Sequence, residues 1–241
     1  MRLEIKNLSK SYGHHPALKN VNISLDGGKI VGLFGPNGSG KTTMIKVIAN
    51  LLMSYSGEVL VEGNKVGPLT KALVSYLPDV NYLEDYWKIS ECIKVFKTFY
   101  ADFDENKCLS LLSKFNFNLE QRVKTLSKGN KEKLQLILVL SRNAKVFLFD
   151  EPIAGVDPAS REIIFDLILE AIPKDALVII TTHLISDIEN FVSHVIFINE
   201  GKIFYDSSKE DLENQYPGKT INEIFIDLFK SQMMGGNNNV W

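Results

Sequence analysis

The stretch "GPNGSGKT", residues 35–42, decides the fold of this 241-residue chain. It matches the pattern G-x-x-x-x-G-K-[ST], and it lies between a predicted strand, "KIVGLFG", and a predicted helix. Glycines let the backbone fold tightly, so that successive N–H groups can face a phosphate. We therefore predict a nucleotide site in which Lys41 reaches the β- and γ-phosphates and the Thr42 hydroxyl contacts Mg²⁺.

The remaining sequence predicts an α/β fold around this loop. The apolar runs "KVFLFD" and "ALVIITT" alternate with the helical pattern "REIIFDLILEAI", which is typical of a mostly parallel sheet covered on both faces. The opening segments "RLEIKNL" and "VNISL" alternate apolar and polar residues as half-buried strands do. Asp26-Gly27-Gly28 then predicts a hairpin turn into the strand "KIVGLFG", and "HVIFI" with "KIFYD" predicts a second hairpin.

Several helices are predicted from apolar spacing. Residues 42–53 form one helix, and residues of about 86–117 form a helical insertion in which Cys92, Phe96 and Phe99 share a face. Asp104 is predicted to cap the second helix of that insertion. Thr220 and Glu223 form a capping-box pattern before a terminal helix. We predict one domain over residues 1–217 with a helical subdomain at about 85–133, a C-terminal helix at 218–234 and a disordered tail at 235–241.

Composition limits the function classes. The net charge is −2, which gives no global basic surface for nucleic acid. The longest apolar runs are far below the ~20 residues that span a bilayer, and no signal peptide is visible. We therefore expect any work at a membrane to require a partner. Cys92 and Cys108 fit no metal or redox spacing and are interpreted as idle thiols in a reducing cytosol.

A pair of carboxylates follows the strand "VFLFD". Ligands of open α/β sheets sit at the carboxyl ends of the strands, so Asp150 can hold Mg²⁺ opposite Thr42. Glu151 can orient or deprotonate a water beside the γ-phosphate. His183 directly follows the strand "ALVIITT" at the same predicted edge, where its side chain could form a hydrogen bond with the γ-phosphate.

A further motif, "LSKGN", precedes another helical run. A helix that begins with these residues offers free N–H groups and a positive dipole end to an anion. The glycine-rich loop, "LSKGN", "FLFDEP", "AGVD" and the strand-end His, in this order, resemble the ATP-binding subunit of ABC transporters. The match runs from about Leu3 to about Asp206. The resemblance implies a P-loop NTPase cassette with an antiparallel β subdomain and a helical subdomain.

The resemblance also implies residue roles. Tyr12 would stack on adenine, Glu151 would be the catalytic carboxylate, and His183 would sense the γ-phosphate. Two such subunits would pack head to tail, so that "LSKGN" of one closes over the ATP of the other. The implied ATP-binding residues are Tyr12, Gly35, Pro36, Asn37, Gly38, Ser39, Gly40, Lys41, Thr42 and Thr43, and the residues acting on the partner's ATP are Ser127, Lys128, Gly129, Asn130 and Asp157. The implied metal ligands are Thr42, Asp150 and Asp79.

Three positions in two motifs depart from the family pattern. Lys128 replaces a glycine of the usual LSGGQ, and Asn130 replaces its glutamine. Asp79, after the strand "ALVSYLP", stands where the family usually has glutamine; it could bind Mg²⁺ directly, but it adds repulsion beside the γ-phosphate. We expect slower or differently coupled hydrolysis.

The favoured hypothesis is an ATPase, with ATP and Mg²⁺ as cofactors, that drives a separate membrane-spanning permease from the cytoplasmic face of the membrane. "AGVDPASR" favours an export-type subunit. One alternative is an ATP-gated regulatory subunit that hydrolyses weakly because of Asp79. A soluble relative acting on DNA or ribosomes lacks support, because no second cassette, coiled coil, zinc motif or basic segment is present. A small-molecule kinase would leave "LSKGN" and "AGVD" unexplained.

Overall fold

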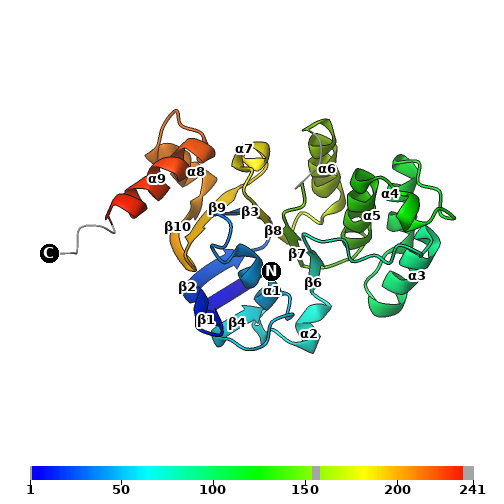
Figure 1. Ribbon diagram of the computed structural model, residues 1–241, viewed down its shortest axis with the longest axis horizontal. Helices are drawn as coiled ribbons and strands as arrows, with labels where there is room; N and C mark the ends of the chain where they lie inside the picture. Colours follow the sequence, from blue (N-terminus) through cyan, green and yellow to red (C-terminus); the bar gives the residue numbers. More distant parts are fainter. Residues whose placement is uncertain (1, 154–157, 236–241) are drawn as a thin grey trace.

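The computed structural model describes residues 2–153 and 158–235. Two β-sheets form the centre of the molecule, with helices at both ends (Figure 1). One end holds α3 (Ile89–Phe99), α4 (Glu105–Lys114) and α5 (Lys128–Leu140), and the opposite end holds α8 (Lys209–Gln215) and α9 (Ile221–Gly235).

The larger sheet, as far as the chain is described, has six strands in the order β10-β9-β3-β8-β7-β6. Its strands are β3 (Ile30–Phe34), β6 (Val74–Leu77), β7 (Val146–Asp150), β8 (Leu177–Thr182), β9 (His194–Asn199) and β10 (Lys202–Ser208). Neighbours run parallel except β10, which pairs antiparallel with β9. Strands β7 and β8 are buried along their whole length. The predicted mostly parallel sheet and its closing hairpin are both confirmed.

The smaller sheet is antiparallel, in the order β2-β1-β4-β5. Its strands are β1 (Arg2–Tyr12), β2 (His15–Asp26), β4 (Ser56–Val61) and β5 (Asn64–Lys65). The predicted hairpin at Asp26-Gly27-Gly28 is wrong, because β2 pairs with β1 through a tight turn at Gly13-His14. Strand β2 is buried on one face only, whereas β3 is apolar on both faces and lies between β8 and β9 of the larger sheet.

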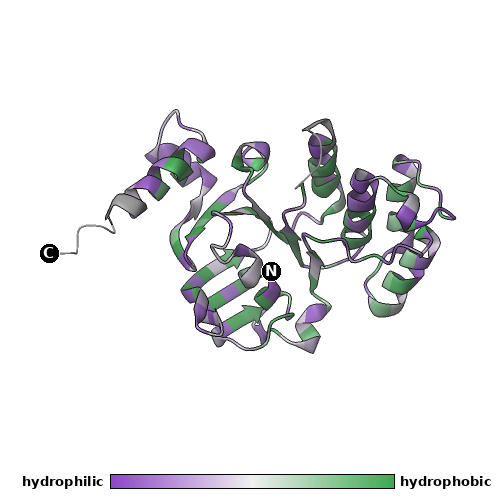
Figure 2. Cartoon of the chain, in the orientation of Figure 1, coloured by the Kyte–Doolittle hydropathy of each residue, from purple (hydrophilic) through white to green (hydrophobic). Residues whose placement is uncertain are grey.

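Side chains of the larger sheet alternate between two hydrophobic clusters. On β7, Val146 and Leu148 pack in a cluster with α1 (Lys41–Ile48) and the smaller sheet. Phe147 and Phe149 point to the opposite face, into a cluster with α5, α6 (Pro158–Ala171) and α7 (Ile185–Ile188). Figure 2 shows the resulting concentration of hydrophobic residues along the strands. The carboxyl ends of β3, β7 and β8 are thereby fixed between two apolar layers.

Helix α1 is shorter than the predicted 42–53. It ends at Ile48, and Asn50 adopts the left-handed conformation (φ 55°) that commonly closes a helix. Leu51, which fits the helical spacing, and Met53, the last residue of the predicted helix, are exposed instead. The short helix α2 (Pro68–Lys71) follows before β6.

The helical insertion is built from α3, α4, the short 3₁₀ helix Val123–Thr125 and α5. Its core includes both cysteines, and burial raises the pKa of Cys92 to about 12 and that of Cys108 to about 11. The expected cap is confirmed, because the Asp104 side chain accepts a hydrogen bond from the backbone N of Lys107 at 2.9 Å. The face predicted for Phe99 is wrong, since that side chain is 76% exposed.

Helix α9 confirms the predicted terminal helix and its capping box. The Thr220 hydroxyl accepts from the backbone N of Glu223 at 3.2 Å, and the Glu223 carboxylate accepts from the backbone N of Thr220 at 2.8 Å. The boundaries predicted for the domain and its helical subdomain stay a prediction. The predicted tail beyond residue 235 lies outside the described residues.

Candidate functional site

The glycine-rich loop leaves the end of β3 and leads into the first turn of α1. Gly40 has φ 109°, and a Cβ there would lie 2.5 Å from the backbone oxygen of Ala17, so only glycine fits. Helix α1 then begins at Lys41. The backbone N–H groups in the first turn of a helix have no partner within the helix, and those of α1 point back toward the loop. The predicted strand–loop–helix context is confirmed.

Lys41 is folded into this loop. Its Nζ donates hydrogen bonds to the backbone oxygens of Gly35 at 2.8 Å and Pro36 at 3.2 Å. Burial lowers its pKa, while Glu151 and Asp150 oppose that shift. The Ser39 Oγ is buried and has no hydrogen-bond partner among the described residues. A buried cation next to an unpaired hydroxyl suits an anionic ligand such as a phosphate.

The end of β7 meets the start of α1. The Thr42 hydroxyl donates to Asp150 Oδ1 at 3.0 Å, and the Thr181 hydroxyl on β8 donates to the same oxygen at 2.8 Å. Asp150 is fully buried, and burial raises its pKa, although these two hydrogen bonds act against the shift. Its Oδ2 has no hydrogen-bond partner among the described residues.

Those oxygens fit a hard cation such as Mg²⁺, which takes carboxylate and hydroxyl ligands. Within residues 2–153 and 158–235, no three His, Cys, Asp or Glu side chains gather to hold a metal. A Mg²⁺ ion near Thr42 and Asp150 would therefore take most of its ligands from phosphate and water, as this ion commonly does.

Glu151 has a strained backbone. Its φ is 50°, in the left-handed region that glutamate seldom adopts, and its backbone N donates to both oxygens of Thr181 at 3.1 Å. Because of this backbone conformation, the Glu151 side chain points in a different direction from the side chain of the buried Asp150. The Glu151 Oε2 lies 3.0 Å from Nδ1 of His183 at the end of β8, so the two predicted catalytic residues are in contact.

The glycine-rich loop borders one cavity together with Ala17, Asp79 and Glu151, whereas Asp150, Thr181 and His183 do not line it. The loop contributes Asn37, Gly38, Ser39, Gly40, Lys41, Thr42 and Thr43. Tyr12 does not line this cavity; it is 49% exposed, with Lys10 Nζ 5.2 Å from its ring centroid.

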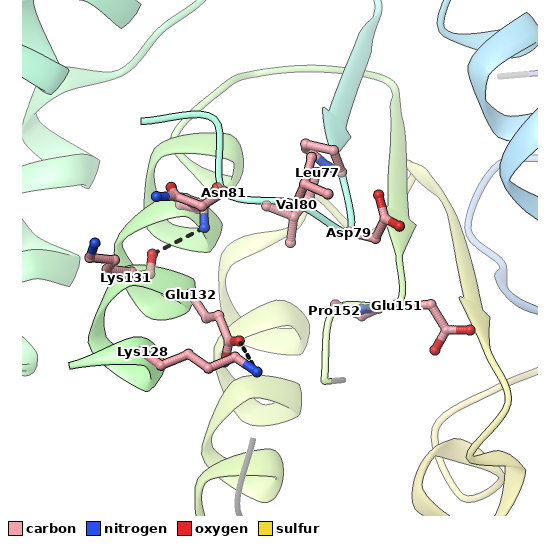
Figure 3. Close-up of a pocket in the computed structure, with 11 residues that line it drawn as sticks. Leu77, Asp79, Val80, Asn81, Lys128, Lys131, Glu132, Glu151 and Pro152 are labelled. Atoms are coloured by element: carbon pink, nitrogen blue, oxygen red, sulfur yellow. Dashed lines mark hydrogen bonds and ion pairs between the residues drawn. The ribbon is translucent and has the colours of Figure 1, made fainter. Parts of the chain in front are cut away.

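A second cavity adjoins the first through Asp79 and Glu151 (Figure 3). Lys128 and Glu132 of α5 lie across it, where Lys128 Nζ is 3.9 Å from Glu132 Oε1. Two of the three departures from the family pattern, Asp79 and Lys128, therefore line the same cavity.

The motif "LSKGN" begins helix α5. The Ser127 Oγ caps the helix by accepting from the backbone N of Asn130 at 3.3 Å, and Ser127, Lys128 and Asn130 are exposed. Together with Gly129, they do not line the cavity of the glycine-rich loop in their own chain. Asp157 lies outside the described residues.

Two residues near Asp150 were not predicted from the sequence. Thr181 binds Asp150, and its signal is the polar pair "TT" at the end of an otherwise apolar strand. Tyr76 on β6 has a buried hydroxyl, and burial, followed by the charges of Asp150 and Asp79, raises its pKa. No sequence pattern distinguishes Tyr76 from a core aromatic.

In the described part of the chain, every helix is too short or too polar to cross a membrane.

Comparisons with known proteins find relatives of this chain. A family model described as ABC transporter matches residues 18–154. The chain is 31% identical over 234 residues to the lantibiotic transport ATP-binding protein SrtF of Streptococcus pyogenes, covering 96% of this chain and 97% of that protein. It is 28% identical to the ABC transporter ATP-binding protein YtrB of Bacillus subtilis, covering 89% of this chain and 74% of that protein.

Solved structures give the same result. A structure of the ATP-binding subunit of an ABC transporter superposes with a TM-score of 0.85 at 26% identity, covering 95% of this chain and all of the other. A cassette in its ADP conformation has a TM-score of 0.76 at 25% identity, covering 94% of this chain and 99% of the other. Motifs, fold and relatives agree, and we conclude that the chain belongs to the ABC transporter family, with the fold of its ATP-binding subunit.

Proposed function

We propose that this protein is an ATPase that dimerises around ATP and powers the movement of a substrate by a separate membrane-spanning partner. The observation that carries the proposal is the bond between Thr42 and Asp150, which joins the glycine-rich loop to the end of β7. The bond holds the buried Asp150 carboxylate against Thr42, which lines one cavity together with Lys41 and Glu151, and this supports a site for phosphoryl transfer.

In the proposed ATP complex, the glycine-rich loop from Gly35 to Thr43 wraps the phosphates. Lys41 leaves the two loop carbonyls to which it now donates and bonds the β- and γ-phosphates instead. The exposed ring of Tyr12 is free to stack on adenine. Thr42 and Asp150, with Asp79 nearby, hold Mg²⁺.

In the hydrolysis step, Glu151 accepts a proton from the attacking water, which becomes a better nucleophile. His183 orients the Glu151 carboxylate in the present structure, and it donates to the γ-phosphate when ATP is bound. When bound, Mg²⁺ neutralises charge that develops on the phosphate oxygens. The left-handed backbone of Glu151 keeps its carboxylate at the cavity while Asp150 stays buried.

Dimerisation follows from the position of "LSKGN". The glycine-rich loop's own cavity is not lined by Ser127, Lys128, Gly129 or Asn130, so we infer that they close over the ATP of a second cassette, together with Asp157. The Ser127 hydroxyl accepts one hydrogen bond as a helix cap, and its proton is free to donate to the γ-phosphate. The N-terminus of α5 adds its positive dipole end.

The proposed partner is a membrane permease, with this chain bound at its cytoplasmic face and not acting on nucleic acid. Export is the proposed direction. Similar proteins include the lantibiotic transport protein above and a Nod factor export ATP-binding protein of Cupriavidus metallidurans, 24% identical over 93% of this chain.

The test is the solution mass of Glu151→Gln protein, measured by light scattering with and without Mg-ATP. Removing the base should trap ATP, so we expect a shift from monomer to dimer on adding Mg-ATP. Lys41→Ala in the Glu151→Gln background is the matched control and should stay monomeric. A Glu151→Gln protein that binds no ATP would overturn the proposal, and one that binds ATP without dimerising would overturn the part played by "LSKGN".

A further inference from the structure

Tyr76 lies next to Asp150 across two paired strands. Strands β6 and β7 are parallel, and Tyr76 is the register partner of Leu148, two residues before Asp150. Side chains two residues apart on a strand share a face. Tyr76 and Asp150 are therefore diagonal neighbours on the face that carries α1, within reach of a long aromatic side chain.

Two oxygen atoms at this point lack partners. Oη of Tyr76 and Oδ2 of Asp150 are both buried without a hydrogen bond among the described residues, whereas Asp150 Oδ1 accepts two. The pairing of β6 with β7 brings both side chains to the same face of the sheet. A buried donor next to a buried acceptor, each unpaired, makes a bond between them favourable.

We propose that Tyr76 is a positioning residue, whose hydroxyl donates to Asp150 Oδ2 and fixes that oxygen for the metal of the ATP complex. This inference rests on the proposed binding of Mg-ATP. The hydroxyl of a tyrosine is protonated at neutral pH, so it can donate. A carboxylate oxygen has two lone pairs, so Oδ2 can accept from Tyr76 and still face the metal or its water. With Oδ1 held by Thr42 and Thr181, this third bond fixes both oxygens.

The experiment compares Tyr76→Phe with wild-type protein. Phenylalanine keeps the ring and its packing and removes only the hydroxyl. Binding of a fluorescent ATP analogue is titrated in EDTA and again with increasing Mg²⁺. In EDTA, we expect Tyr76→Phe to bind the analogue with an affinity within twofold of wild type. The Mg²⁺ concentration that gives half of the full increase in affinity should be roughly tenfold higher than for wild type, because residues that hold metal ligands commonly contribute that much to metal affinity.

Tyr82→Phe is the matched control. It removes another tyrosine hydroxyl, which donates to the backbone oxygen of Gln135 at 3.5 Å in the helical insertion. We expect its Mg²⁺ midpoint to equal that of wild type.

Two results would overturn the role of Tyr76: an unchanged Mg²⁺ midpoint in Tyr76→Phe, or an equal loss of affinity in EDTA and in Mg²⁺. Either leaves the proposed function intact as long as wild-type protein binds the analogue. Wild-type protein that does not bind it would instead contradict the proposed function.

Discussion

The hydroxyl of Thr42 donates a 3.0 Å hydrogen bond to Asp150, 108 residues later in the chain. The bond ties the first turn of α1 to the end of β7, and Thr181 ties the same carboxylate to β8. Three elements of the fold thus meet at one buried oxygen, and the stability of the site depends on its donors.

We predict that Thr181→Val lowers the free energy of unfolding by about 1–3 kcal/mol, because it leaves the buried Asp150 carboxylate short of a donor. Urea denaturation measures this effect. Thr181→Ser keeps the hydroxyl and should lose clearly less. In an Asp150→Asn background the cost of Thr181→Val should shrink, since the two residues interact. Equal losses for Val and Ser would contradict the prediction.

Replacing Glu151 by glycine should give a more stable protein than replacing it by alanine. Both changes remove the carboxylate, but only glycine relieves the left-handed φ of 50°, for a difference of about 0.5–1 kcal/mol. In an ordinary strand or helix, the alanine variant would be the more stable of the two. Thermal unfolding of the two variants measures the difference, and a more stable alanine variant would show that this backbone is not strained. Both variants should lose ATP hydrolysis.

Asp79→Gln should raise the steady-state rate of ATP hydrolysis several-fold. The negative charge of Asp79 acts on Asp150, whose pKa is raised by burial and further by this neighbour. The same charge faces the cavity that would hold the γ-phosphate. Asp85→Asn is the control, because it removes an exposed carboxylate that pairs with Lys131 at 2.6 Å. Unchanged basal and transport-coupled rates in Asp79→Gln would refute this role.

Acid should loosen the start of α9. Hydrogen bonds from the backbone N and hydroxyl of Thr220 hold the pKa of Glu223 below its ordinary value of 4.5. The cap is therefore complete above pH 4.5 and is lost as the pH falls through the lower pKa of the folded state. Hydrogen-exchange protection of the first turn of α9, measured from pH 6 to pH 3, should fall over that window. Glu223→Gln should have weaker protection that does not change over the same window.

Local patterns predicted what depends on local geometry. The glycine-rich loop, the Asp104 cap and the Thr220 capping box are each defined within a few residues, and all are confirmed. Asp26-Gly27-Gly28 is equally typical of a hairpin, but it joins two different sheets, because β3 needs neighbours on both edges and burial on both faces.

The contacts around Asp150 depend on register between distant strands. Thr181 reaches it because β7 pairs with β8, and Tyr76 lies beside it because β6 pairs with β7. No spacing within one segment carries that information, so the two carboxylates were predicted, whereas Thr181 and Tyr76 were not.

The two cysteines of this chain are both sealed in the core of the helical insertion, with the thiol pKa values raised to about 12 and 11. Thiolates are the reactive form, so thiol-specific reagents should not modify the native protein. A single cysteine introduced at exposed Lys124, three residues before Ser127, would then be the site that takes a spectroscopic probe or cross-linker. The approach of two cassettes can therefore be followed with a probe on the introduced cysteine, without first replacing Cys92 and Cys108.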